Sequence, residues 1–482
     1  MTIRRLVAIA ATVCAVALVA SCSSPAPPPP PDPNELAARI TADALYVHLD
    51  ALQKIADANG GRRSEGTGGY DASVDYVANA LRNKGFDVQT PEFDRYGGTR
   101  GGSPRLTVGG RGHAVEKASL LVDTGPDGVN APTLRPAKAA GCTPADYAGV
   151  EVNGAIAVVD DGGCSVVAKH DAARDQGAVG VLVALSGSDG SPPTLFTPGY
   201  YRRLTLPVGI IDSATNSALR RTSAPVRLRL DGQPVMVKSR NVIAQTRTGG
   251  TGDVVMVGAH LDSVGGGPGI NDNGTGVAAV LETALQLGGS PQIANAVRFA
   301  FWGSEEIGLE GSRAYVRGLD RDRLDDIALY LNFDMLGSPN AGYFTYDGDQ
   351  SAASGPPADV PEGSAGMERL LAGYLNLAGV RPADMPLAEV TDYDPFRAAG
   401  VPIGGTTTGA AQLKSAVQAR LWGGRPGAPF DPNHHTARDN ITNVDRHALE
   451  IMAPSVAYAV ASYAQSIEGP NGVPPRDRRN RG

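Results

Sequence analysis

The stretch Asp253 to Asn273 reads DVVMVGAHLDSVGGGPGINDN, and the interpretation of the whole chain starts from it. Its first part, Val254 to Ala259, is a continuous apolar run rich in β-branched residues, which predicts a buried strand. The run leads into His260 and Asp262, and a glycine-rich loop separates these from Asp272. In open α/β sheets, ligands bind beside the carboxyl ends of the strands. The stretch therefore predicts a polar site at that edge of a sheet.

Strands and helices alternate along most of the chain, as judged from the spacing of apolar residues. The predicted strands cover 86–93, 241–245, 254–259, 297–302 and 327–333, and the predicted helices cover 34–58, 70–84, 276–287, 367–378 and 449–466. This alternation predicts an α/β fold with a mostly parallel mixed sheet flanked by helices. With 482 residues, of which 42% are hydrophobic, the chain can bury a large core.

The segment 110–232 has a different sequence pattern from the segments on either side of it. Its apolar runs are short and are separated by glycine, proline and aspartate. It predicts an inserted, smaller α+β unit with its own core. Residues 34–109 and 233–468 would then form the main domain around it. The last residues, 469–482, are polar and rich in proline and arginine, and we expect them to be disordered.

The N-terminal residues 1–22 combine a charged start with an apolar run that is too short for a comfortable membrane span. They predict a signal peptide. The ending Val19-Ala20-Ser21-Cys22 resembles a bacterial lipobox, in which the cysteine is lipidated; an ordinary secretory signal that happens to contain a cysteine is the alternative. The proline-rich segment 23–33 suits a stiff spacer off a membrane. We therefore expect a lipid-anchored protein on the outer face of the cell membrane.

Only Cys142 and Cys164 remain outside the signal region. In an oxidising compartment, two cysteines most simply form a disulfide. They are too few for a cysteine-ligated metal site. The formal net charge of −7 gives no reason to expect nucleic-acid binding, which leaves a basic footprint.

Histidines and carboxylates follow several predicted strand ends and recur in one C-terminal loop. They are His260, Asp272, Glu305, Glu306, Asp334, His434, His435 and Asp439. Imidazole and carboxylate ligands without thiols suit a catalytic zinc or a related divalent metal. If one carboxylate bridges, the set is large enough for two ions, which can together activate a water and stabilise an oxyanion.

Each of these features also has a simpler interpretation when it is taken alone. Asp262 could be a turn residue, Glu305-Glu306 a solvated helix start, and His434-His435 part of a polar loop. The glycine run Gly265 to Gly269 lacks the spacing of a dinucleotide-binding fingerprint. Because the polar residues coincide at strand ends, we favour a metal site over these separate explanations.

Four motifs, in order along the chain, carry a resemblance to a known family. They are Gly258 to Ser263, Gly269 to Gly274, Phe301 to Glu306 and Asn332 to Met335. Together they resemble the co-catalytic zinc aminopeptidases of the Streptomyces griseus aminopeptidase type, which implies a zinc exopeptidase-like fold. The small-residue spacing after Cys164 resembles the protease-associated domain that is inserted in several exported peptidases.

The resemblance implies two zinc ions and a role for each matching residue. Asp272 would bridge the ions, with His260 and Asp334 completing one site and Glu306 and His435 the other. Glu305 would be the general base that takes a proton from the metal-bridging water and passes it to the leaving amine. Asp262, His434 and Asp439 would support the ligands, with Asp262 holding His260.

Some positions depart from the family pattern. His434 stands where the family has a tyrosine that hydrogen-bonds the oxyanion, and it is also a rival ligand to His435, which we favour because it precedes Asp439 by four residues, as in the family motif. Asn433 and Arg438 replace two cysteines that flank this loop in the family. Val390 replaces an arginine, which puts in doubt how a substrate carboxylate is held.

Our first hypothesis combines the N-terminal signal with the resemblance: an exported, lipid-anchored metalloaminopeptidase that acts on peptide substrates and that we expect to be monomeric. The resemblance implies that it removes apolar N-terminal residues such as leucine. A second hypothesis is glutaminyl cyclisation, which uses one zinc on the same fold. A third is a non-catalytic receptor or peptide-binding lipoprotein that uses the inserted unit. The five intact ligand positions argue against the second and third hypotheses.

Overall fold

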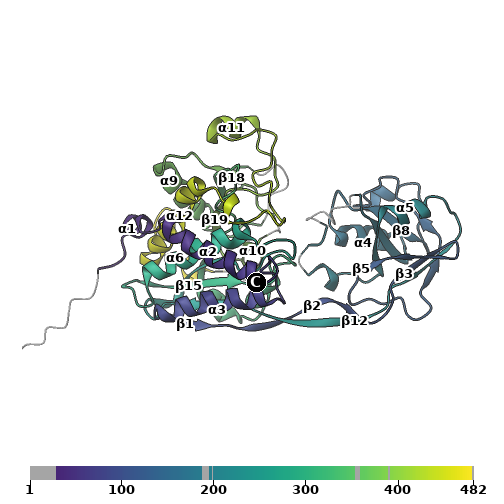
Figure 1. The fold of residues 1–482 in the computed structure, drawn as a ribbon, viewed down its shortest axis with the longest axis horizontal. Helices are drawn as coiled ribbons and strands as arrows, with labels where there is room; N and C mark the ends of the chain where they lie inside the picture. Colours follow the sequence, from purple (N-terminus) through teal and green to yellow (C-terminus); the bar gives the residue numbers. More distant parts are fainter. Residues whose placement is uncertain (1–28, 187–194, 198, 353–358, 389–390, 480–482) are drawn as a thin grey trace, which may run out of the picture.

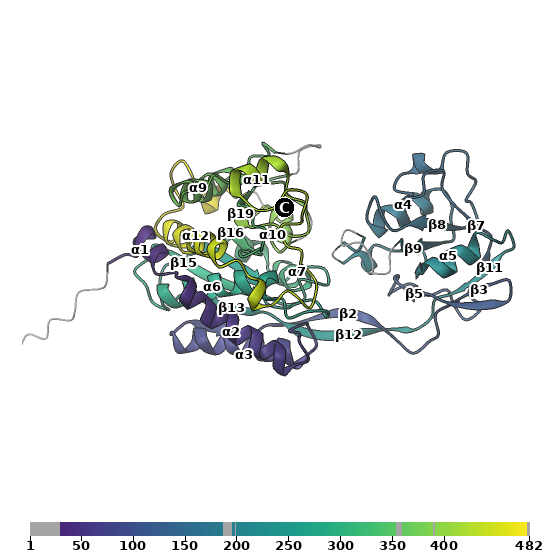
Figure 2. The ribbon, with the colours of Figure 1, turned by 45° about the horizontal axis from the view of Figure 1, so that its top comes forward.

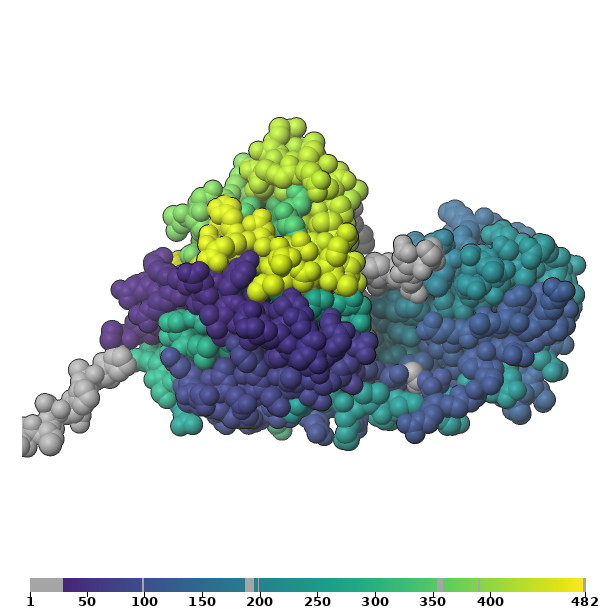
Figure 3. Space-filling model, viewed as in Figure 1, coloured from purple at the N-terminus to yellow at the C-terminus, as the bar shows by residue number. Residues whose placement is uncertain are grey.

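The computed structural model describes residues 29–186, 195–197, 199–352, 359–388 and 391–479. The expected signal peptide with Cys22, and Val390, lie outside these ranges. A large α/β domain carries a smaller inserted unit at the end of a two-stranded ribbon (Figure 1). A view turned by 45° shows the same arrangement (Figure 2), and the inserted unit forms a separate lobe in the space-filling view (Figure 3).

The large domain is built on an eight-stranded mixed sheet. In spatial order its strands are β1 (Asp87–Gln89), β13 (Val242–Gln245), β15 (Asn295–Trp302), β14 (Gly250–His260), β16 (Ile327–Phe333), β19 (Ile403–Thr407), β17 (Phe344–Tyr346) and β18 (Ala383–Met385). The central strands β15, β14, β16 and β19 are parallel, and β13 and β17 pair antiparallel at their two sides. The α/β fold with a mixed sheet is therefore confirmed.

Helices cover both faces of this sheet. One face packs against α2 (Ala42–Ala58), α3 (Gly68–Asn83), α6 (Gly276–Leu287), α9 (Ser364–Leu377) and α12 (Arg446–Gln465), and the other against α7 (Glu310–Arg317), α8 (Arg321–Asp325) and α10 (Tyr393–Ala398). Two short helices, α1 (Pro33–Ala38) and α11 (Ala416–Trp422), complete the domain. Along β14, Val255 and Val257 enter the first core and Met256 enters the second, which explains why the apolar run is continuous.

Two expected elements are each divided in the structure. The expected helix 34–58 becomes α1 and α2, because the side chain of Thr41 accepts the N–H of Ala44 and begins a new helix. The expected strand 86–93 becomes β1 and β2 (Glu92–Arg100), with Pro91, which has no N–H to donate, between them.

The inserted unit hangs on the ribbon formed by β2 and the antiparallel β12 (Gln233–Arg240). It contains two sheets, of which one comprises β5 (Glu116–Lys117), β10 (Val208–Ile211), β9 (Gly180–Ala184), β8 (Ile156–Asp160) and β7 (Thr133–Leu134), and the other β4 (Arg111–Ala114), β3 (Arg105–Val108), β11 (Val226–Arg229) and β6 (Val129–Ala131). Among the described residues of the unit, the α-helices α4 (Val166–Asp175) and α5 (Ser213–Leu219) accompany these sheets. β3, which precedes the expected boundary at 110, pairs with β11 in the second sheet.

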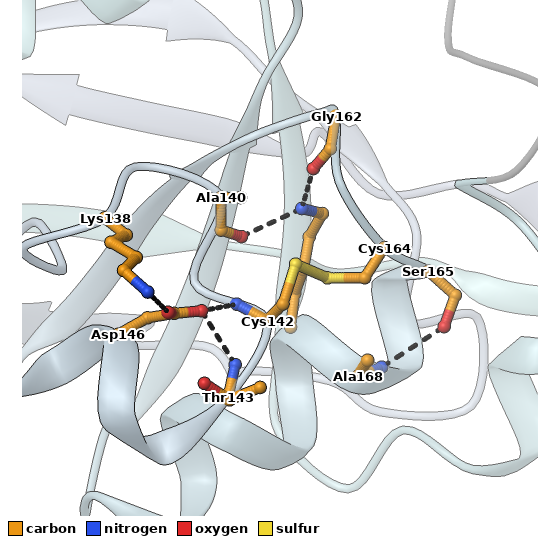
Figure 4. Close-up of a disulfide and its surroundings, with 10 residues drawn as sticks. Lys138, Ala140, Cys142, Thr143, Asp146, Gly162, Cys164, Ser165 and Ala168 are labelled. Atoms are coloured by element: carbon orange, nitrogen blue, oxygen red, sulfur yellow. Dashed lines mark hydrogen bonds and ion pairs between the residues drawn. A yellow bond between two sulfur atoms is a disulfide. The ribbon is translucent and has the colours of Figure 1, made fainter. Parts of the chain in front are cut away.

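A disulfide joins Cys142 to Cys164 beside α4 (Figure 4). The buried ammonium group of Lys169 donates to the carbonyl oxygens of Ala140 and Gly162, which lie near the two cysteines. The cross-link closes a loop with a sequence separation of 22 residues. In the chain-entropy model, a loop of this size stabilises the folded state by about 3 kcal/mol.

The C-terminal segment differs from the expected disorder of 469–482. Val473 is buried in the main core, and the guanidinium of Arg479 pairs with Asp253 and donates to the carbonyl oxygens of Gly252 and Asp325. These contacts hold the segment through residue 479 against the amino end of β14. Within the described ranges, no helix combines the length and apolar character needed to cross a bilayer.

Candidate metal centre

The parallel strands place the expected ligands at one edge of the sheet. His260 is the last residue of β14, Glu305 and Glu306 come shortly after β15, and Asp334 directly follows β16. His260 lies opposite Trp302 in the parallel register, so the two strands end at the same level. The polar side chains therefore gather where these three strands end.

Asp272 lies at the centre of this group. It lies in the turn Ile270–Thr275 that leads into α6, where the backbone of Asp272 and Asn273 is not helical, and its peptide bond to Asn273 is cis. Its Oδ1 lies 3.1 Å from Nε2 of His260, and its Oδ2 lies 3.3 Å from Nε2 of His435. The two oxygens of one carboxylate thus face histidines from distant parts of the chain.

Each side of Asp272 also has a second carboxylate. Nε2 of His260 lies 3.5 Å from Oδ1 of Asp334, and Nε2 of His435 lies 3.0 Å from Oε2 of Glu306. The structure thus brings together all five residues expected to be ligands, in two groups that share Asp272.

The chemistry of these side chains fits divalent cations. Oδ1 of Asp334 and Oε1 of Glu306 are buried, and neither accepts a hydrogen bond from any residue in the described ranges. A buried carboxylate oxygen without a partner is unfavourable, and a cation would satisfy it. Ligand atoms of His260, Asp272 and Glu306 lie within 4.8 Å of one another, as do those of Asp272, His434 and His435. Nitrogen and oxygen donors in this arrangement suit zinc.

Glu305 lies beside the ligands. It is buried, and its Oε2 is 3.9 Å from Nε2 of His260. Burial raises the pKa of Glu305, and the nearby carboxylates of Asp392, Glu306 and Asp334 raise it further, against the opposing charge of His260. A carboxylate with a raised pKa next to a metal centre is suited to accept and return a proton.

Asp262 supports the site differently from the expectation. The backbone carbonyl oxygen of Asp262, 3.1 Å from Nδ1 of His260, is the atom that pairs with the imidazole, while the carboxylate is 3.8 Å away. The carboxylate instead accepts the backbone N–H groups of Glu305 and Glu306, at 3.1 and 3.3 Å. These two bonds fix the loop after β15, so Asp262 links two strand ends.

Asp439 orients the central turn. Its carboxylate oxygens accept the backbone N–H groups of Asn271 and Asp272, at 2.7 and 3.0 Å. Burial raises the pKa of Asp439 to about 7, and the neighbouring charge of Asp272 adds to the shift. Asp439 therefore acts on Asp272 through the backbone.

The two adjacent histidines are not equivalent. Their rings stack with centroids 3.7 Å apart, and Nε2 of His434 lies 3.1 Å from Oδ2 of Asp272. Among the described carboxylates, His434 pairs with Asp272 alone, whereas His435 also reaches Glu306. This geometry favours His435 as the ligand and leaves His434 facing the same space.

Arg63 is a supporting residue that the sequence did not reveal. It is fully buried, and its guanidinium donates to the carbonyl oxygens of Leu261, Pro268 and Gly269. These carbonyls belong to the loop between His260 and Asp272, so Arg63 fixes the spacing of two expected ligands. Arg63 follows a helix and a pair of glycines, and no sequence pattern predicts that an arginine at such a position is buried.

A second supporting set is formed by Thr391 and Asp392. Thr391 donates to Oδ2 of Asp334 at 2.9 Å and accepts a hydrogen bond from Asn332. Asp392 is buried and accepts the hydroxyl of Ser312 at 2.5 Å. Thr391 therefore orients one expected ligand, and Asp392 adds negative charge near Glu305.

The inserted unit touches the large domain close to this edge. The hydroxyl of Tyr201 donates to the buried carboxylate of Glu310 at 2.7 Å, and Arg202 pairs with the same carboxylate. Glu310 begins α7, just after the loop that carries Glu305 and Glu306. The contact therefore couples the insertion to the loop of two expected site residues.

A mixed α/β sheet with two histidine–carboxylate groups sharing one aspartate defines a metallohydrolase class of site. Residues 241–460 match the model of peptidase family M28, and residues 129–219 match that of the PA domain. The chain is 51% identical over 453 residues to a probable lipoprotein aminopeptidase, LpqL, of Mycobacterium tuberculosis, covering 92% of this chain and 89% of that protein. The protein therefore belongs to peptidase family M28.

Other comparisons agree with this assignment. An aminopeptidase of Pseudomonas aeruginosa is 37% identical over 440 residues, which cover 88% of this chain and 81% of that protein. Among solved structures, the zinc aminopeptidase BSAP from Bacillus subtilis gives a TM-score of 0.64 at 22% identity, covering 90% of this chain and 97% of that one. An aminopeptidase from Aneurinibacillus sp. strain AM-1 gives 0.63 at 23% identity, with 92% and 98% covered. These structures show the shared fold.

Proposed function

We propose that this protein is an exported, lipid-anchored aminopeptidase that uses two zinc ions to release apolar N-terminal residues from peptides. The observation that carries the proposal is the position of Asp272, whose two carboxylate oxygens face separate histidine–carboxylate pairs. The relatives named as aminopeptidases support the reaction class.

His260, Asp272 and Asp334 would hold one ion, and Asp272, Glu306 and His435 the other. When bound, such a pair lowers the pKa of a water and polarises the scissile carbonyl group. Glu305 then accepts a proton from the attacking water and delivers it to the leaving amine nitrogen. Its burial next to His260 keeps this proton exchange away from bulk solvent.

Nε2 of His434 lies 3.1 Å from Oδ2 of Asp272, the oxygen that His435 also faces. The imidazole of His434 would donate a hydrogen bond to the oxyanion that develops on the substrate carbonyl, the task that the tyrosine performs in the family pattern. The ring has only one described carboxylate partner, Asp272, so its orientation depends on that bond and on stacking with His435.

The activity is tested with leucine p-nitroanilide and with metal analysis of the purified protein. We expect hydrolysis together with about two zinc ions per chain, complete loss of activity on dialysis against a chelator, and recovery when zinc is returned. A content near one zinc, with cyclisation of N-terminal glutamine, would instead support the glutaminyl cyclase hypothesis. A protein whose function survives chelation would support the peptide-binding hypothesis.

The anchor is tested by replacing Cys22 with alanine. An acylated cysteine at this position would hold the protein in the membrane fraction, so Cys22→Ala is expected to move most of the protein into the soluble extracytoplasmic fraction. Detergent phase partitioning and mass spectrometry of the mature N-terminus measure this. Cys14→Ala, in the same apolar run, is the matched control and should partition like the wild type. Unchanged partitioning of Cys22→Ala would overturn the anchor assignment.

A further inference from the structure

The short helix α11 carries exposed apolar side chains at the outer end of the large domain. Leu413, two residues before the N-cap Ser415, and Val417 are each 63% exposed, and Leu421 is 46% exposed. Val417 and Leu421 are four residues apart on the helix, so they lie on the same side of it. Figure 1 shows α11 standing clear of the sheet, and the same part of the chain forms a knob in Figure 3. Apolar side chains gathered on a protruding element indicate a contact surface.

The opposite side of α11 is firmly packed. The ring of Trp422 meets that of Phe344 edge to face, with centroids 5.0 Å apart, and its Nε1 donates to the carbonyl oxygen of Arg381 at 2.8 Å. The ammonium group of Lys414 is buried and donates to the carbonyl oxygen of Gly423 at 3.0 Å, which joins the chain before the helix to the chain after it. The outward direction of the apolar side therefore follows from the fold and not from loose packing.

Arginines accompany the apolar side chains. Arg420 lies three residues after Val417, on the same side of α11, and Arg425 follows the helix; both are exposed. Within the described ranges, no carboxylate forms an ion pair with Arg420 or Arg425. The segment 395–430 contains four basic residues and no aspartate or glutamate, although the whole chain has a formal net charge of −7. This surface is therefore locally cationic on an acidic protein.

Apolar side chains beside arginines are complementary to an anionic bilayer. The apolar groups enter the boundary between headgroups and acyl chains, and the guanidinium groups stay at the level of the phosphates. The proposed anchor brings such a bilayer close. Ten residues separate Cys22 from Asp32, which caps α1, and a proline-rich spacer spans about 3.1 Å per residue, so its reach is about 30 Å. A weak contact is then sufficient, because the tether raises its effective concentration.

We propose that the α11 surface, formed by Leu413, Val417, Arg420, Leu421 and Arg425, docks on the anionic phospholipid headgroups of the membrane. The inference rests on the proposed function only for the anchor that keeps the bilayer near. A proline-rich spacer alone lets the large domain turn, whereas docking through α11 fixes which side of the domain faces the lipid.

The test measures binding of the chain from Ser23 to Gly482, which lacks the lipid, to vesicles of phosphatidylcholine and phosphatidylglycerol. Every helix and strand that the structure describes lies within this range. Sedimentation should show binding at least about tenfold tighter than to vesicles of phosphatidylcholine alone, and high salt should remove most of this difference. Neither the lipid nor peptidase activity enters the measurement, so its outcome is separate from the anchor and peptidase assignments.

Three variants identify the surface. Leu421→Ser should lower the vesicle partition coefficient at least about tenfold, because it removes an apolar side chain that leaves water on docking. Arg420→Gln and Arg425→Gln should each lower it about fivefold at low salt, the usual contribution of one basic residue near an anionic surface. All three side chains are exposed, so the variants should unfold at the temperature of the parent chain.

Two substitutions elsewhere are the matched controls. Met236→Ser, on the exposed side of β12, and Arg111→Gln, on β4 of the inserted unit, should bind vesicles like the parent chain. A parent chain that does not bind the anionic vesicles, or a Leu421→Ser protein that binds them equally well, would overturn the proposal. A dimer seen by light scattering, without vesicle binding and dissociated by Leu421→Ser, would also overturn it, because a second copy would then cover this surface.

Discussion

Replacing Glu305 with glutamine is expected to lower kcat for leucine p-nitroanilide by about 10²–10⁴-fold, the usual contribution of a general base. The glutamine amide has the size of the carboxylate and fits in the same place beside His260 and Asp262. It cannot accept a proton from water, so it cannot act as the general base. Because Glu305 is not among the expected ligands, zinc content should remain near two per chain. KM should change much less than kcat, since the lost interaction belongs to the proton transfer.

Glu282→Gln is the matched control for this experiment. Glu282 is also a buried glutamate, but it lies on α6 and its carboxylate pairs with His48 at 3.0 Å, away from the ligands. The control should keep kcat within a few-fold of the wild type. If Glu305→Gln hydrolysed the anilide at the wild-type rate with its zinc intact, another group would have to be the base.

Replacing Asp272 with asparagine is expected to abolish measurable activity through loss of metal. The two oxygens of Asp272 face His260 and His435, both expected to be ligands, and an amide offers one neutral oxygen and one N–H₂ group that repels a cation. Substitutions that only support metal ligands already weaken affinity by about 10–100-fold, so the loss at a shared ligand should exceed about 100-fold. Metal analysis after dialysis should find fewer than about one zinc per chain.

Asp253→Asn, on strand β14, provides the comparison. Asp253 lies toward the amino end of β14 and pairs with Arg479, so its loss should affect stability but leave zinc content and kcat near wild type. An Asp272→Asn protein that retained two tightly bound zinc ions would contradict the shared-ligand arrangement, whatever its activity.

The local sequence pattern was sufficient to predict helices and strands where the apolar periodicity is long and regular. The helix expected at 276–287 and the strand expected at 327–333 have the same bounds in the structure, as α6 and β16. The candidate site followed from the same logic, because parallel strands end at one edge and the polar residues after them must meet there. Chain topology therefore brought His260, Glu305 and Asp334 together before any side-chain geometry was known.

Other features depended on contacts that no local pattern contains. The burial of Arg63 depends on carbonyl groups about 200 residues away in the sequence. The carboxylate of Asp262 serves the loop after β15 rather than His260, because the backbone carbonyl of the same residue already reaches the imidazole.

The ribbon of β2 and β12 has a consequence for how such chains can diversify. The chain leaves the large domain along β2 and returns along its antiparallel neighbour β12, so the two connections to the inserted unit lie side by side (Figure 2). A short turn between the two strands would restore an uninterrupted hairpin. A whole accessory module can thus be gained, exchanged or deleted by a local genetic event, and the catalytic edge inherits no change in strand order.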